Sequence, residues 1–317
     1  MIESRRAIII WLATVSSVAA FVAGFTMTVD PFGYFGNNNI GYYFSSEKQF
    51  KYNLVGTFHY NAIVLGDSRI AYTDTNEVNF PGYKFVNGGI PGSDLTEQVA
   101  LLKSSKMNDL KIAVFGLQSG DVASCEKHPE EQPVWEAGRH ALSWTQIRYA
   151  ILALIARSKG QLPAYKTDGS RTTASKRLEE SLTDLKTERY WNKVEANRRS
   201  LQGMVSAEAR LGQECRLILE EARSLAERHG FALMIIFLPR NADVLQHAAM
   251  STSQVRAHTS ALVSELKGIV PNVVDLTDSP LSDSRNFWLD DPVHFKPEIG
   301  AKIIETAIHR TEEQTVE

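Results

Sequence analysis

Hydrophobic positions gather first at the N-terminus, where residues 7–29 form an unbroken apolar run, AIIIWLATVSSVAAFVAGFTMTV. The run holds 23 residues without a charge. As a helix it would measure about 34 Å, more than the roughly 30 Å hydrocarbon core of a bilayer. A helix buried in a protein core is the alternative, but such a helix usually keeps a polar face, and this run has none. The pattern therefore predicts one transmembrane helix.

Charges on either side of this run predict its orientation. Arg5 and Arg6 lie just before it and Asp30 lies just after it, so the positive-inside rule keeps the N-terminus in the cytoplasm. The main domain would then be periplasmic, held by a single pass through the inner membrane. A cleaved signal peptide is the alternative, although the small residues at 17–19 lie inside the apolar run rather than after it.

Beyond this run, short apolar segments alternate with amphipathic stretches, a pattern typical of a parallel sheet covered by helices on both faces. It predicts an α/β three-layer sandwich with about five parallel strands. The expected strands are Asn61–Gly66, Lys84–Asn87, Lys111–Leu117, Ala232–Pro239 and Asn272–Leu276. The expected helices are Ser93–Ser105, Gly138–Arg157, Asn197–His229, Ser253–Ile269 and Pro297–Arg310.

The separation between the third and fourth strands is too long for a simple crossover, so we expect a helical insertion at about residues 118–196. Within it, residues 160–175 are polar and we expect them to be mobile. The chain then divides into a cytoplasmic stub and anchor (1–29), a Gly-, Asn- and Tyr-rich linker (30–59), the α/β domain (60–310) and a short polar tail expected to fray (311–317).

Composition narrows the possible functions. Hydrophobic residues make up 43% and charged residues 22% of the 317, as in an ordinary globular protein. The 37 acidic and 34 basic residues nearly balance, so the charge does not favour nucleic acid as a partner. Two cysteines, Cys125 and Cys215, are too few for a disulfide scaffold or a four-thiolate zinc site. A single bridge between them is possible in an oxidising compartment.

Candidate catalytic residues fall where ligands bind in an open parallel sheet, beyond the carboxyl ends of the strands. Ser68 follows the first strand on a turn into a helix, where free N–H groups would point at whatever it attacks. The glycines of residues 87–92, NGGIPG, let the backbone approach a substrate and hold an oxyanion. Asp291 lies three residues before His294, a spacing that lets it bond Nδ1 and leaves Nε2 to take the serine proton.

Each of these pieces alone has an ordinary explanation as a helix cap, a packed ring or a turn. Together, and in this order, they resemble the sequence blocks of the SGNH (GDSL-type) hydrolase superfamily. The match consists of GDS at 66–68, NGGIPG at 87–92 and DPVH at 291–294, and it spans about residues 60–308. The resemblance implies a flavodoxin-like α/β fold.

The resemblance also implies roles for individual residues. Ser68 would be the nucleophile, His294 the base and Asp291 the group that orients the imidazole. The backbone N–H groups of Ser68 and Gly89 would hold the oxyanion, with the side chain of Gln118 as a further donor. We expect no cofactor.

One block departs from the family. Where its third block reads Gly-x-Asn-Asp, residues 115–121 read FGLQSGD, and Gln118 replaces the asparagine with a longer side chain. Membrane-anchored branches that resemble the alginate O-acetylation proteins and the D-alanyl transfer protein of teichoic acid are also loose in this block. That resemblance implies acyl-group chemistry on a cell-envelope polymer, by transfer or by hydrolysis.

Other residues near these blocks are candidates for contacts with the substrate. They are Asp67, Arg69, Asn87 and Trp288, although Asp67 is equally well placed to cap the turn after the first strand. Asp290, Asp291 and His294 have no further His or Cys at ligand spacing, so we expect no metal.

The sequence thus favours an exported, membrane-tethered serine esterase or O-acyltransferase. Its expected partners are an acylated polysaccharide or other envelope glycan, and the membrane through the N-terminal helix. The alternative from another class is a non-catalytic SGNH-like protein that binds glycan and assists a membrane acyltransferase or export complex. A hydrolase of lipids or small esters with the same fold is a third interpretation.

Overall fold

The structure is a computed structural model that describes residues 2–36, 38, 40–43, 47–125, 141–172, 188–206, 209–247, 252–288 and 290–316. Its centre is a sheet of five parallel strands in the order β2-β1-β3-β4-β5. These strands are β1 (Ala62–Gly66), β2 (Phe85–Asn87), β3 (Ile112–Leu117), β4 (Ala232–Phe237) and β5 (Asn272–Asp275). The predicted α/β fold with a five-stranded parallel sheet is confirmed.

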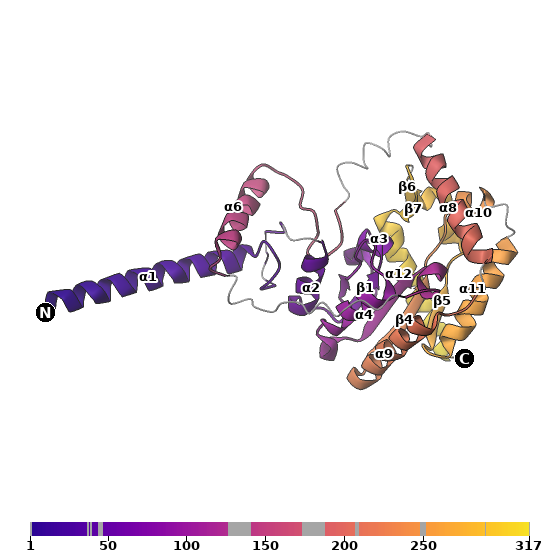
Figure 1. The fold of residues 1–317 in the computed structure, drawn as a ribbon, viewed down its shortest axis with the longest axis horizontal. Coiled ribbons are helices and arrows are strands. Elements are labelled where there is room, and N and C mark those ends of the chain that lie inside the picture. Colours follow the sequence, from indigo (N-terminus) through magenta and orange to yellow (C-terminus); the bar gives the residue numbers. More distant parts are fainter. Residues whose placement is uncertain are drawn as a thin grey trace.

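Helices cover both faces of this sheet (Figure 1). Alternate strand residues point to opposite faces, so Ile63 and Phe115 belong to one buried cluster while Val64 and Val114 belong to the other. The first cluster is completed by α2 (Glu47–Thr57), α4 (Leu95–Lys103), α9 (Gln213–His229) and α11 (Thr252–Lys267). The second is completed by α3 (Ser68–Ala71), α12 (Pro297–Val316) and the hairpin of β6 (Phe287–Trp288) and β7 (Asp291–Phe295).

Three expectations about the helices were wrong. The single helix expected at Asn197–His229 is two helices, α8 (Glu188–Ser206) and α9. The chain between them passes against the loop after β3, where the N–H of Gly212 donates to the carbonyl of Val122 at 2.9 Å. The expected linker contains α2, whose Phe50 is fully buried, and the expected frayed tail continues α12 to Val316.

The polar segment expected to be mobile is packed where the structure describes it. Asp168 and Ser170 are buried, and both bond the turn after α3, the first through its carboxylate to the hydroxyl of Thr75 at 2.5 Å. Residues 173–175 of this segment and 138–140 of the helix predicted at Gly138–Arg157 lie outside the described residues. That helix is observed as α6 (Trp144–Ser158). A short helix not expected from the sequence is α10 (Ala242–His247).

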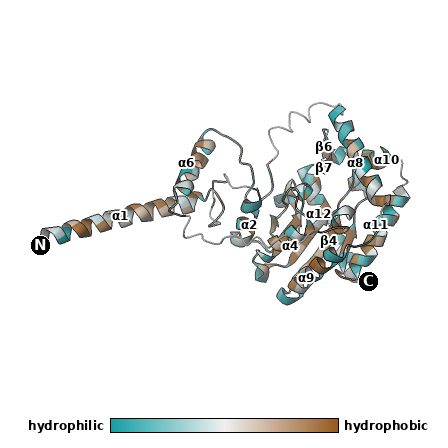
Figure 2. Ribbon diagram, in the orientation of Figure 1, coloured by the Kyte–Doolittle hydropathy of each residue, from teal (hydrophilic) through white to brown (hydrophobic). Residues whose placement is uncertain are grey.

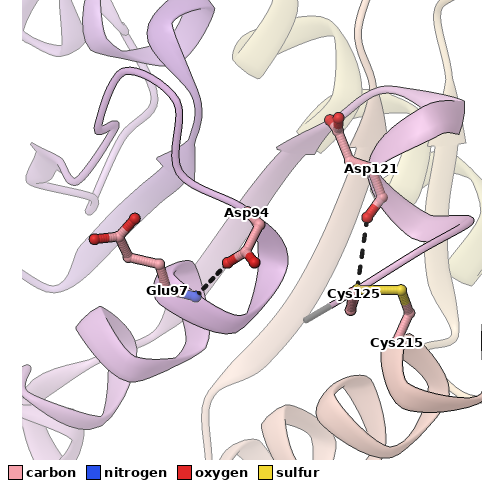
Figure 3. Close-up of a disulfide and its surroundings, with 5 residues drawn as sticks. All are labelled: Asp94, Glu97, Asp121, Cys125 and Cys215. Atoms are coloured by element: carbon pink, nitrogen blue, oxygen red, sulfur yellow. Dashed lines mark hydrogen bonds between the residues drawn. A yellow bond between two sulfur atoms is a disulfide. The ribbon is translucent and has the colours of Figure 1, made fainter. Parts of the chain in front are cut away.

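A disulfide joins the two cysteines and fixes the loop after β3 to α9 (Figure 3). Cys125 follows the 3₁₀ turn Ser119–Val122, and Cys215 lies in the first turn of α9. The other 3₁₀ turns are Thr75–Glu77, Met107–Asp109, Pro280–Ser282 and Ser284–Asn286.

The N-terminal helix α1 (Ile2–Val29) projects away from the α/β domain (Figure 1). Among the described residues it is the one helix long and apolar enough to cross a membrane, with a mean hydropathy of 2.2 over an 18-residue window within Ser4–Val29. Its length and composition suit a membrane span or a signal anchor.

Candidate active site

Ser68 is presented by the sharp connection between β1 and α3. Asp67 caps α3, and its carboxylate accepts the N–H of Arg69 at 2.9 Å. Two glycines at the strand ends make room for α3 to lie on the sheet: a Cβ on Gly66 or Gly116 would lie 2.4 or 2.6 Å from the side chain of Ile70. Ser68 is therefore held as the first residue of a short, tightly seated helix.

Asn87 binds the end of this helix to the sheet through hydrogen bonds. It is fully buried, and its Nδ2 donates to the carbonyls of Ile70 and Thr73 at 2.6 and 2.7 Å. Its Oδ1 accepts from the N–H of Gly89 and from Lys51 Nζ, both at 2.9 Å. All its polar atoms are used inside the protein, so the expectation that Asn87 contacts substrate was wrong.

Gly89 allows the backbone of α3 to pack closely against the loop after β2. A Cβ at this position would lie 2.4 Å from the backbone nitrogen of Ala71, so only glycine fits beneath the helix. Its N–H is already donated to Asn87. This geometry contradicts the expectation that Gly89 is an oxyanion donor.

Ser68, His294 and Asp291 form one continuous chain of hydrogen bonds. Nε2 of His294 lies 2.8 Å from Ser68 Oγ, and Nδ1 of the same ring lies 2.8 Å from Asp291 Oδ2. Asp291 begins β7 and His294 lies in the same strand. The fold brings together a hydroxyl and an imidazole that are 226 positions apart, in the order needed for a serine nucleophile activated by a base.

The surroundings keep Asp291 ionised. Burial alone would raise its pKa, but the hydrogen bond and charge of His294, the N–H of Val293 and the ammonium of Lys193 together lower the pKa well below its ordinary value. Lys193 Nζ lies 3.5 Å from Asp291 Oδ2 and donates to the carbonyl of Asp290 at 3.0 Å. A permanent carboxylate is what the orienting position of such a chain requires.

Three residues that sequence reasoning missed support the imidazole. Besides Lys193 on α8, the ring of Tyr72 meets the edge of His294 with centroids 5.1 Å apart. Arg171 in turn donates to Tyr72 Oη at 2.9 Å. Tyr72 directly follows α3, whereas Lys193 and Arg171 come from the long connection between β3 and β4. No spacing in the sequence links them to His294.

Gln118 lies at the end of β3 and caps the 3₁₀ turn that follows it. Its backbone carbonyl accepts the N–H of Asp121 at 3.0 Å, and its own N–H donates to the carboxylate of Asp121 at 2.6 Å. Gln118 also lines a small pocket with Pro292 and Val293, the two residues between Asp291 and His294. The Nε2 atom of its side chain is a donor that could bond a ligand.

This pocket beside the hydrogen-bonded chain is polar. Its wall includes Asn197, Arg240 and Asn241. Burial, and then the charge of nearby Arg69, lower the pKa of Arg240 to about 10. The guanidinium donates to the hydroxyl of Ser119 at 3.3 Å. The amides of the pocket are engaged within the protein: Asn197 Nδ2 donates to the carbonyl of Lys193 at 2.8 Å, and Asn241 Oδ1 accepts the N–H of Asp243 at 2.9 Å.

The remaining predicted contact residues lie around the same site. Arg69 is mostly buried, with Nη1 3.3 Å from Asp67 Oδ2. Trp288 is half-buried on β6 and pairs with Asp291 across the hairpin. No group of three or more His, Cys, Asp or Glu side chains within the described part of the chain is arranged to hold a metal ion.

No protein-family model and no curated protein matches this chain. Among solved structures, one titled "The structure of a putative platelet activating factor from Streptococcus pneumonia" is similar over 84% of this chain and 90% of its own, at 13% identity and a TM-score of 0.38. A likeness this distant carries no argument about activity. The case for function therefore depends on the arrangement of Ser68, His294 and Asp291.

Proposed function

We propose that this protein is a membrane-tethered serine esterase or O-acyltransferase that acts on acyl esters, acetyl above all, of a cell-envelope polysaccharide. The observation that carries the proposal is the hydrogen-bonded chain from Ser68 through His294 to Asp291, with both links at 2.8 Å. The resemblance of the blocks around these residues to the SGNH superfamily supports ester chemistry.

The proposed reaction has two halves. Ser68 Oγ attacks the ester carbonyl while Nε2 of His294 takes its proton, and the ionised Asp291 stabilises the resulting imidazolium. His294 then gives the proton to the leaving alkoxide, which leaves an acyl group on Ser68. Water or a sugar hydroxyl, deprotonated by the same imidazole, attacks that ester and restores the serine.

The oxyanion needs donors other than Gly89. The N–H of Ser68 at the start of α3 is one, and Gln118 Nε2 is a second. A third candidate is Gly92, which is exposed, adopts φ +77° and has open space beside its Cα. Its turn is tied to the end of β1, because the N–H of Ile90 and the hydroxyl of Ser93 both bond the carbonyl of Gly66.

A polar pocket and an anchor support a glycan substrate at the envelope. Asn197, Arg240 and Asn241 line a small polar pocket against Pro292 and Val293, which directly precede the base in sequence. In this proposal the pocket lies at the margin of the substrate site. In this proposal α1 spans the inner membrane with its N-terminus in the cytoplasm, so the site faces the periplasm.

The test is active-site labelling of the full chain in detergent. We expect a fluorophosphonate to label the wild type and Ser260→Ala, a control for loss of an exposed serine, but not Ser68→Ala. The wild type and Ser260→Ala should hydrolyse p-nitrophenyl acetate, and Ser68→Ala should not. Equal labelling of wild type and Ser68→Ala would refute the proposal. An acyl product on an added acceptor oligosaccharide would identify transfer rather than hydrolysis.

A second candidate function is a non-catalytic glycan-binding partner of an acylation or export complex. The observations that favour it are the engaged N–H of Gly89 and the use of Gln118 as a cap, since each removes or constrains an oxyanion donor. It would be supported by glycan binding that is equal in wild type and Ser68→Ala, together with no labelling of either protein.

A further inference from the structure

Helix α6 has an inverted pattern of exposure. Its exposed face carries Trp144, Ile151 and Ile155, which are 74, 46 and 41% exposed. Its buried face carries the small residues Ala150 and Ala153. A helix on the surface of a water-soluble domain normally buries its large apolar side chains and exposes polar ones. The outer face of α6 therefore requires an apolar cover.

The buried face of α6 packs against the end of the N-terminal helix. Ala150 and Ala153 form one cluster with Val29, the last residue of α1. One turn earlier in α1, the hydroxyl of Thr26 donates to the carbonyl of Ala141, just before α6. The two helices are thus joined at the point where α1 would leave the membrane.

The direction of α6 differs from that of α1. Figure 1 shows α6 rising steeply from the end of α1 rather than running along it, between α1 and the α/β domain. If α1 stands across the bilayer, α6 is therefore inclined to the membrane normal. Figure 2 shows that apolar residues are prominent in both helices.

We propose that α6 is an interfacial helix whose outer face lies among the lipids of the outer leaflet of the same membrane that α1 crosses. The proposal rests on the anchoring part of the proposed function and is independent of catalysis. The occupant of the apolar face is the bilayer itself, because α6 packs on the last turn of α1, whose own large apolar side chains are exposed as well. Amphipathic helices with this orientation insert their apolar face into the boundary between head groups and acyl chains.

Aromatic rings around the junction of α1 and α6 support a position at the boundary between head groups and acyl chains. Phe32 and Tyr149 stack edge to face with centroids 5.2 Å apart, and Tyr34 follows at 5.8 Å from Phe32. Aromatic side chains are typical of the boundary between membrane and water. Arg148, on the exposed side of α6, has a long stem that can reach the head groups while its neighbours contact lipid.

Lipid contact of Trp144 tests the proposal directly. The full chain, in a Trp11→Phe background that removes the tryptophan of α1, is reconstituted in phosphatidylethanolamine and phosphatidylglycerol vesicles with brominated acyl chains. We expect bromine near the carbonyl end of the chains to quench tryptophan emission and most of this quenching to be lost in Trp144→Phe. Trp191→Phe, which removes a tryptophan of α8, is the matched control and should keep it.

Quenching that is the same with and without Trp144 would overturn the proposal. Alkaline carbonate extraction of the same vesicles tests the anchoring by α1 separately. If the protein resists extraction while Trp144 stays accessible to aqueous iodide, α1 anchors the protein but α6 does not insert. Shielding of Trp144 from both bromine and iodide, with a cross-linked dimer, would show that a second copy covers the face and would also overturn it. Ile151→Asp with Ile155→Asp should weaken the quenching by shallow bromine.

Discussion

Lys51 and Asn87 show that the position of Ser68 depends on buried residues beneath the helix that carries it. Lys51 is fully buried and donates to the carbonyls of Asn87 and Gly169, both at 2.8 Å, and to Asn87 Oδ1. Asn87 in turn bonds two carbonyls at the end of α3. One buried ammonium thus connects α2, β2 and the segment around Gly169 beneath the helix that carries Ser68.

The charge state of Lys51 predicts a pH dependence of stability. Burial lowers the pKa of Lys51 to about 7, against about 10.4 in an unfolded chain. Between these values the unfolded chain holds more protons than the folded one, so this residue's contribution to the free energy of unfolding rises with pH. Relative to Lys51→Met, the wild type should gain about 2 to 3 kcal/mol between pH 6 and pH 9.

Urea unfolding of the two proteins across this pH range measures that gain. Lys302→Met, which removes an exposed lysine of α12, is the control and should follow the wild type. A constant difference between wild type and Lys51→Met would contradict the prediction.

Some residues of the candidate site could be predicted from the sequence and others could not. Ser68, Asp291 and His294 could be selected because a strand end and a three-residue spacing place each of them, and the structure joins them; their catalytic roles stay predictions. Asn87 and Gly89 were misassigned because a motif does not show which donors and acceptors are already satisfied inside the fold.

At the scale of elements, strands were more predictable than helices. Each strand is a short apolar run buried on both faces, so its signal is local. The break between α8 and α9 depends on a contact of Gly212 with the loop after β3, and α2 owes its place to burial of Phe50 and Lys51. Such contacts join distant parts of the chain, so no local pattern reports them.

Helix α8 reaches the catalytic chain from the long connection between β3 and β4. Its Lys193 is a positioning residue, because it holds the carbonyl of Asp290 and faces the carboxylate of Asp291. Lys193→Met should lower kcat for p-nitrophenyl acetate about tenfold, equivalent to about 1.4 kcal/mol, and leave KM unchanged. Lys193→Arg keeps a donor and a positive charge and should recover most of the loss. Equal kcat values for Lys193→Met and wild type would show that α8 has no such role.

Like the contact between Lys193 and Asp291, the disulfide joins elements that are far apart in the sequence. It closes a loop of 90 positions between Cys125 and Cys215, and in the chain-entropy account a loop of this length stabilises a fold by about 3 to 5 kcal/mol. We expect the free energy of unfolding of the double variant Cys125→Ser, Cys215→Ser to be lower by that amount, which urea unfolding would show as a lower midpoint concentration. Wild type unfolded under reducing conditions is the control and should match it. Coincident unfolding of oxidised wild type and the double variant would contradict the prediction.

In the molecule as a whole, the N-terminal helix and the disulfide both bear on which compartment the α/β domain occupies. A bond between Cys125 and Cys215 persists in an oxidising compartment and is rare in the cytosol. Under the proposed orientation, the two arginines before α1 stay in the cytoplasm and the α/β domain lies on the other side of the membrane. A membrane-crossing α1, an interfacial α6 and an oxidised domain then form one consistent proposal.

This arrangement predicts the state of the thiols in bacterial cells. In the full chain, neither Cys125 nor Cys215 should react with a membrane-permeant alkylating reagent until a reductant is added, because the bond forms after export. A variant without residues 2–29 should stay in the cytoplasm and react at both thiols. Cys125→Ser in the full chain calibrates the shift in mass from one free thiol, that of Cys215. Two reactive thiols in the full chain without reductant would place the domain on the cytoplasmic side and reverse the proposed orientation of α1.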